Sequence, residues 1–193
     1  MSGRFPELAP EQMSEAQRAV AAEISSGPRG GVRGPFIALL HHPELARRVQ
    51  LLGEHLRFGT GLAPDLVELV VLFVARSWGC QYEWYAHARI AREKTDLSPE
   101  IIDALASGAE PANLRDDQRI VYTLCRDMFR KGAVDDAVFG EAAGLMGRAG
   151  VLDVLALCGY YSMLAMVLNA AQIPLPAGVA PPLQPSEPGL GAG

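Results

Sequence analysis

Four residues with side chains that transfer protons in enzymes lie within one stretch of twenty residues, and they are Glu68, Cys80, Glu83 and His87. The rest of that stretch is apolar and favours helix. A thiol, two carboxyl groups and an imidazole are the groups that general acid–base and nucleophilic catalysis use. Proton-transfer chemistry is therefore the leading hypothesis from the sequence.

The spacing of these residues predicts that most of them share one side of a helix. Positions 80, 83, 84 and 87 follow the i, i+3, i+4, i+7 rule, so Cys80, Glu83, Trp84 and His87 should project together. Glu83 lies one turn from His87 and is expected to hold the imidazole in one tautomer. Cys80 falls in the first helical turn, where free N–H groups should lower its thiol pKa. Glu68 joins them if the preceding helix packs as a hairpin.

Structural readings of the same residues remain open. A cysteine on an apolar helix is often a small buried hydrophobe, and Glu83 with His87 could be a surface pair. Glu68 could serve only as a first-turn carboxylate that favours the helix dipole. The adjacent His41 and His42 could bind a metal, but the start of a helix explains them better, and we predict no metal site.

Helices are predicted almost throughout, because apolar residues recur at three and four and the proline and glycine positions fit helix ends. The predicted helical segments are 12–24, 36–40, 43–58, 64–78, 80–94, 98–106, 116–131, 135–146 and 150–171. We divide the chain into an N-terminal helix with a glycine-rich connector (1–33), a helical domain (34–173) and a flexible Pro/Gly/Ala-rich tail (174–193). The connector lacks a phosphate-binding motif.

Composition narrows the classes of function. The 193 residues are 49% hydrophobic and 20% charged, with a formal net charge of −5, which argues against nucleic acid or an anionic membrane as the main partner. Three widely spaced cysteines favour neither a disulfide framework nor structural zinc, so we expect a reducing, cytoplasmic setting with no secretory signal. The uncharged segment 154–168 is too short to span a membrane and should be a core or subunit-interface helix.

The segment 34–171 resembles the carboxymuconolactone decarboxylase and alkylhydroperoxidase D-like superfamily. The resemblance lies mainly in the block from Glu68 to His87, with helical flanks that include Gly-Pro-Phe-Ile-Ala-Leu-Leu-His-His-Pro and Gly-Tyr-Tyr-Ser-Met-Leu-Ala-Met. It implies an all-α fold of about eight helices, a homo-oligomer (trimer or hexamer), a pocket near subunit contacts and no cofactor.

The two branches of that superfamily imply different chemistry. Glu68, Cys80 and His87 fall on the peroxidase-branch positions, but Glu83 replaces the second cysteine of the C-x-x-C pair, which removes the resolving thiol. A glutamate four residues before the histidine instead matches the decarboxylase branch.

The leading expectation is a lyase that resembles carboxymuconolactone decarboxylase and acts on a small carboxylated or lactone-like metabolite. His87 would transfer the proton and Glu83 would orient it, while Cys80 and Glu68 assist, and Trp84 and Tyr82 line the substrate pocket. One alternative is a thiol-dependent hydroperoxide reductase that uses Cys80, with peroxiredoxin-like activity. Another is a non-catalytic helical oligomer that binds a metabolite or a partner.

Overall fold

The computed structural model describes residues 4–184, and this part of the chain folds into eight α-helices without a strand, which confirms the predicted all-α class. The helices are α1 (Glu15–Ser26), α2 (Pro35–Leu39), α3 (Pro43–Glu54), α4 (Pro64–Ser77), α5 (Gln81–Lys94), α6 (Pro99–Ser107), α7 (Asp116–Lys131) and α8 (Asp136–Ala171). A short 3₁₀ turn, Pro10–Gln12, precedes α1.

Local chemistry explains where the helices begin and end. Proline occupies the first position of α2, α3, α4 and α6, where its missing N–H leaves no bond unmade. His42 caps α3 by accepting a hydrogen bond from the backbone N–H of Leu45, which supports the helix-start reading of this histidine. Gly108 and Gly132 end α6 and α7 in the left-handed conformation that glycine adopts without strain.

Two helices differ from the sequence prediction. The helix predicted to reach residue 58 continues past Glu54 only as a π-helical turn, His55–Gly59. The two helices predicted at the C-terminal end are joined into α8, but Gly147 interrupts it with φ 71° and ψ 168°. Glycine adopts this φ without strain. The interruption at Gly147 lies between the two predicted segments, 135–146 and 150–171.

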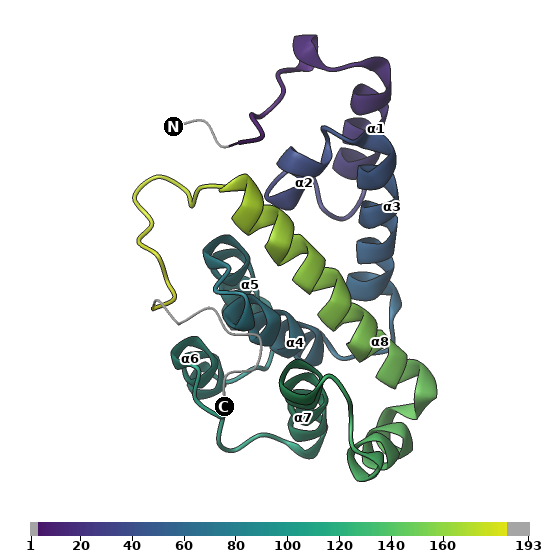
Figure 1. Cartoon of the computed structure of the whole chain (residues 1–193), viewed down its shortest axis with the longest axis vertical. Coiled ribbons are helices and arrows are strands. Elements are labelled where there is room, and N and C mark those ends of the chain that lie inside the picture. Colours follow the sequence, from purple (N-terminus) through teal and green to yellow (C-terminus); the bar gives the residue numbers. More distant parts are fainter. Residues whose placement is uncertain (1–3, 185–193) are drawn as a thin grey trace.

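α4 forms the centre of the molecule and contacts α5, α6, α7 and α8. Six apolar side chains of α4 are fully buried: Leu69, Val70, Val71, Leu72, Val74 and Ala75. A helix that is apolar on all sides belongs inside a core. Figure 1 shows α8 crossing the molecule diagonally, with α2 near its C-terminal end and α7 near its N-terminal part.

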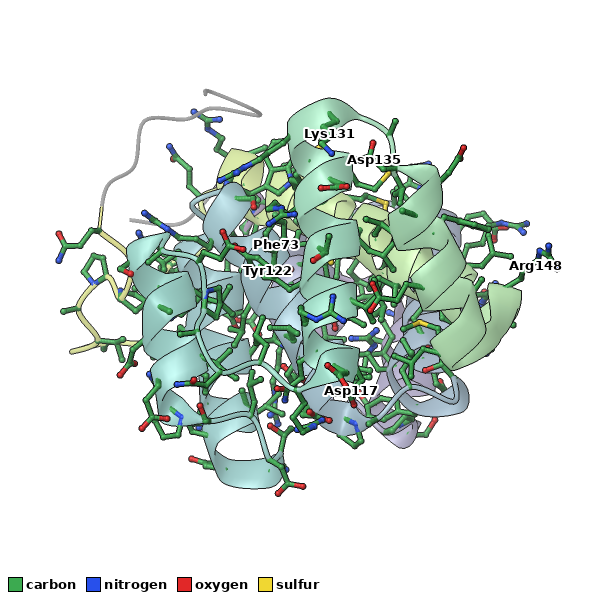
Figure 2. All side chains as sticks on the ribbon, turned by 90° about the horizontal axis from the view of Figure 1, so that it is seen from below. Phe73, Asp117, Tyr122, Lys131, Asp135 and Arg148 are labelled. Carbon is green, nitrogen blue, oxygen red and sulfur yellow. The ribbon has the colours of Figure 1, made fainter. Side chains whose placement is uncertain are left out.

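Aromatic side chains join α4 to α7. The ring of Phe73 on α4 meets the edges of Tyr122 and Phe129, with centroids 5.6 Å and 5.3 Å away. Figure 2 shows Phe73 and Tyr122 together between these helices, while Lys131 and Asp135 pair beyond the end of α7. Such edge-to-face contacts stabilise the packing beyond the area they bury. The helix that carries Glu68 is therefore held in place along its length.

A polar contact fixes the beginning of α4. The Asp65 carboxylate accepts hydrogen bonds from Arg115 Nη2 at 2.6 Å and from Gln118 Nε2 at 2.8 Å. Burial alone would raise the pKa of Asp65, but the bonds from Arg115 and Gln118 outweigh it and lower the pKa. Asp65 is therefore structural, one turn before Glu68.

α8 is long and apolar enough to cross a membrane by length and composition alone. Half of its most apolar window is buried inside the protein, through packing on α4 and α7. This agrees with the predicted core helix. Leu152 (65%) and Met166 (49%) of α8 are exposed in the single chain. The predicted subunit contact of this helix and the predicted oligomer stay predictions.

Part of the predicted tail packs against the helical domain in the described residues, and its flexibility stays a prediction. Leu183 is buried, and its backbone exchanges two hydrogen bonds with the Gln81 side chain at 2.9 Å and 3.0 Å. Arg76 also donates to the carbonyl of Gln184. The apolar side chain of Leu183 packs in the hydrophobic core. The Pro/Gly composition of the segment gave no indication of this contact. Positions 185–193 of the predicted tail lie outside the described residues.

Candidate functional site

The candidate site lies where α4 and α5 form a hairpin. Gly79 makes the tight connection, because its φ of 56° lies in the left-handed region. The Cys80 N–H then donates to the carbonyl of Ala75 at 2.8 Å, and Cys80 becomes the N-cap residue of α5. The predicted hairpin is thus present, and it brings Glu68 against the face of α5 that carries His87.

Glu68 is the hydrogen-bond partner of His87. Its Oε2 lies 2.7 Å from His87 Nδ1, and both residues are buried, at 4% and 8% exposure. The prediction that Glu83 orients the imidazole is therefore wrong. Helical spacing placed Glu83 near His87, but the facing helix aims Glu68 directly at the ring nitrogen. A carboxylate only accepts hydrogen bonds, so Nδ1 donates in this bond, and in the neutral imidazole Nε2 keeps its lone pair.

Arg57 is a second neighbour of Glu68 that the sequence analysis missed. Its Nη2 lies 4.0 Å from Glu68 Oε1, and its side chain is 16% exposed. Arg57 belongs to the π-helical turn His55–Gly59, a type of local distortion that is frequent at functional sites. No spacing rule links residue 57 to residue 68, so only the folded chain shows this contact.

Tyr161 of α8 lies against the imidazole, and Tyr160 lies beside Tyr161. The His87 ring meets the Tyr161 ring edge-on, with centroids 5.1 Å apart, and burial raises the pKa of the Tyr161 hydroxyl. The neighbouring Tyr160 hydroxyl accepts a hydrogen bond from Arg29 Nη2 at 3.0 Å. A β-carbon at Gly53 would overlap Tyr160, so this glycine lets α3 approach. The sequence offered no signal for the contacts of these two tyrosines.

Glu83 is buried without a complete set of hydrogen bonds. It is 3% exposed, and its Oε2 has no partner among the described residues. Burial raises the pKa of this carboxyl well above its usual range, because the charged form loses its hydration. Burial therefore favours the neutral, protonated form of Glu83 over the carboxylate that was expected.

Cys80 has the opposite pKa shift from the predicted one. Burial, followed by the nearby Glu83, raises the pKa of the thiol to about 12. The backbone N–H groups of the first turn of α5 favour the thiolate, as expected, but burial outweighs them. The thiol packs with Ala165 and Leu168 of α8. Cys80 in this state is a neutral thiol.

The two residues predicted to line a substrate pocket differ in their surroundings. Trp84 is 2% exposed and belongs to the main hydrophobic core. Tyr82 is partly buried beside Cys80, and its ring lies against the backbone of Gly34 at the end of the glycine-rich connector. Their role toward a substrate stays a prediction.

The acid–base cluster, which consists of Glu68, Cys80, Glu83 and His87, is buried inside the protein. A surface depression of about 340 Å³ is lined by Pro64, Asp65, Glu93, Lys94, Thr95 and Asp96. None of these residues belongs to the cluster. In residues 4–184, no group of three histidine, cysteine or acidic side chains is placed to hold a metal ion.

Comparisons with known proteins find one family model that matches part of the chain and two structures with a similar fold. Residues 43–115 match the model of the carboxymuconolactone decarboxylase family. The fold is similar to two crystal structures, each 18% identical: the alkylhydroperoxidase AhpD core of an uncharacterized peroxidase-related protein from Ralstonia eutropha JMP134, and an uncharacterized peroxidase-related protein from Silicibacter sp. TM1040. Their TM-scores are 0.73 and 0.74, and the alignments cover 89% and 90% of this chain and 91% of each of theirs.

A comparison with curated proteins finds no match. The family model covers α3 to the start of α7, which includes Glu68, Cys80, Glu83 and His87. The fold similarity covers about nine-tenths of the chain. Residues 43–115 thus carry the pattern of the carboxymuconolactone decarboxylase family, in agreement with the predicted resemblance, and the fold is similar to that of two peroxidase-related proteins.

Proposed function

We propose that this chain is a cofactor-independent acid–base enzyme that resembles carboxymuconolactone decarboxylase and acts on a small carboxylated or lactone-like metabolite. The observation that carries the proposal is the 2.7 Å bond between Glu68 and His87, which fixes the tautomer of a buried imidazole. His87 Nε2 is then the atom that accepts or returns the substrate proton. Glu68 is the residue that orients it.

The neutral carboxyl of Glu83 supplies the hydrogen bond or proton that a decarboxylation or lactone step requires. Loss of carbon dioxide beside a carbonyl leaves an enolate, and a donated hydrogen bond or proton stabilises that charge as it develops. Two titratable groups with different environments commonly divide the acid and base roles. Glu83 is the better acid, and His87, held by Glu68, is the better base.

Arg57 is the group best placed to bind a substrate carboxylate. Its guanidinium is mostly buried, and its Nη2 lies 4.0 Å from Glu68 Oε1. The guanidinium therefore retains N–H groups that can bind a planar anion. We expect Arg57→Ala to raise KM about 10- to 100-fold, because one charge-assisted contact is lost. Steady-state kinetics of Arg57→Ala and Arg57→Lys should show partial recovery by lysine. An unchanged KM in both variants would contradict this role.

The thiol-dependent hydroperoxide reductase is the second candidate. Its support is the peroxidase-related description of the two structures with a similar fold. Against it stand a buried thiol with a pKa of about 12 and the replacement of the second motif cysteine by Glu83. Only the thiolate attacks a peroxide efficiently, so Cys80 is a poor nucleophile at neutral pH.

A paired assay separates the candidates. Wild type and Cys80→Ser are each given hydrogen peroxide with dithiothreitol, and separately a panel of lactones and β-keto acids. Acid–base catalysis predicts that Cys80→Ser retains turnover of the carbon substrate within about tenfold, because the thiol takes no electrons. Peroxide consumption that disappears in Cys80→Ser, with no turnover of any carbon substrate, would favour the thiol mechanism instead. The third candidate, a non-catalytic oligomer, predicts no turnover in either assay.

A further inference from the structure

Two cysteines outside the acid–base cluster form a close pair. Cys125 on α7 and Cys158 on α8 are both buried, at 1% and 5% exposure, and their Sγ atoms lie 3.4 Å apart. Their separation in sequence is 33 residues, so only the packing of α7 on α8 brings them together. Neither has a role in the proposed acid–base chemistry.

We propose that Cys125 and Cys158 are a redox-active dithiol, which hydroperoxide converts to an intramolecular disulfide that joins α7 to α8. The sulfur atoms must approach by roughly 1.4 Å to reach the disulfide length of about 2.05 Å. A shift of that size is within the reach of side-chain rotation and a small helix displacement. The third thiol, Cys80, packs separately with Ala165 and Leu168.

The chemistry balances with one hydroperoxide as oxidant. One thiol loses its proton and attacks the peroxide oxygen, the O–O bond breaks, and a sulfenic acid and an alcohol (water, for hydrogen peroxide) result. The second thiol then attacks the sulfenic sulfur and releases water as the S–S bond forms. Two electrons pass from the two thiols to the O–O bond, and reduction by an external dithiol reverses the change.

The neighbour at 3.4 Å determines the product. A sulfenic acid beside a second thiol is captured within the molecule before further oxygen is added, because the local thiol concentration is high. The first step is slow, since the hydrogen bond with Cys158 and burial raise the pKa of the Cys125 thiol well above its usual range. The pair should therefore respond to sustained peroxide and react faster at alkaline pH.

The cysteine pair is linked to the acid–base cluster through Tyr161. Cys158 lies one helical turn before Tyr161, whose ring contacts the His87 imidazole. Drawing Cys158 toward α7 displaces this part of α8. Disulfide formation is thus expected to change the environment of His87 without any change in the cluster's own residues.

Intact-mass measurement and peptide mapping test the proposal. The full-length protein is treated with hydrogen peroxide at pH 8.5, and the remaining thiols are then alkylated. We expect a loss of 2 Da and a cross-linked peptide that contains Cys125 and Cys158, both reversed by dithiothreitol. The same product should form in Cys80→Ser, whereas Cys125→Ser should instead accumulate oxygen adducts on Cys158.

Three results would overturn the proposal: no loss of 2 Da, sulfinic or sulfonic adducts on both cysteines of wild type, or a disulfide that contains Cys80. Wild-type mapping alone decides the point if Cys125→Ser fails to fold. The connection to His87 has its own readout, the imidazole proton resonance of His87 in Cys80→Ser. It should shift on oxidation, and an unchanged resonance in the disulfide form would refute that connection.

Discussion

Glu68→Gln should lower kcat by about 10²- to 10⁴-fold on the carbon substrate that the paired assay identifies, and His87→Gln should do the same. The glutamine side chain is nearly isosteric with glutamate, but its amide can donate to His87 Nδ1. That bond would favour the tautomer with the proton on Nε2, which removes the lone pair that the reaction needs. The bond length of 2.7 Å and the burial of both groups make the effect large.

The control for this prediction is Glu93→Gln, an identical change at an exposed position of α5. It should leave kcat within twofold. Because Glu68 acts through His87, a structural role must be separated from an orienting one. Nitrogen-15 NMR of His87 should report a tautomer change in Glu68→Gln while the circular dichroism spectrum is unchanged. A fully active Glu68→Gln variant, or one with the original tautomer, would contradict the assignment.

Much of the fold is predictable because its signals are local. Proline at helix starts and glycine at φ values near +70° punctuate the chain, and the predicted boundaries of most helices lie within three residues of the observed ones. The hairpin of α4 and α5 also followed from sequence, because Gly79 breaks an otherwise continuous helical pattern. That inference was enough to place Glu68 near His87.

The pairing within the site was not predictable for a physical reason. Helical spacing identifies which residues share a face, but hydrogen-bond partners depend on how far a facing helix is rotated and shifted. Spacing along the helix made Glu83 the expected partner of His87, and only the packing of α4 on α5 shows that Glu68 takes that place. Arg57 lay outside any pattern because a π-helical turn shifts the register of the residues after Glu54.

The pKa shift of Cys80 was predicted with the wrong sign because two opposing effects compete. A helix N-terminus favours a thiolate, and this effect is visible from position alone. Desolvation depends on what covers the thiol, here α8 from a distant part of the chain, and it is the larger of the two. Desolvation likewise raises the pKa of the buried Glu83 carboxyl.

Glu83 gives the protein a stability that should decrease as pH rises. Its folded-state pKa lies above the value of about 4.3 that an unfolded chain has, so the folded state retains a proton that the unfolded state releases. Stability from this group is complete below pH 4.3 and is lost as pH rises toward the folded-state pKa. Within that interval the slope approaches roughly 1.4 kcal/mol per pH unit.

Glu83→Gln should therefore become more stable relative to wild type as pH rises above the pKa of an unfolded glutamate. Glutamine fills the same space. The free-energy cost of burying its amide without a full set of hydrogen bonds does not vary with pH. Urea unfolding of both proteins at several pH values measures the difference, in which all other titrating groups cancel. Glu93→Gln, exposed on the same helix, should follow wild type throughout. Parallel curves for wild type and Glu83→Gln would mean that Glu83 ionises normally, and the acid in the proposed mechanism would then have to be His87 alone.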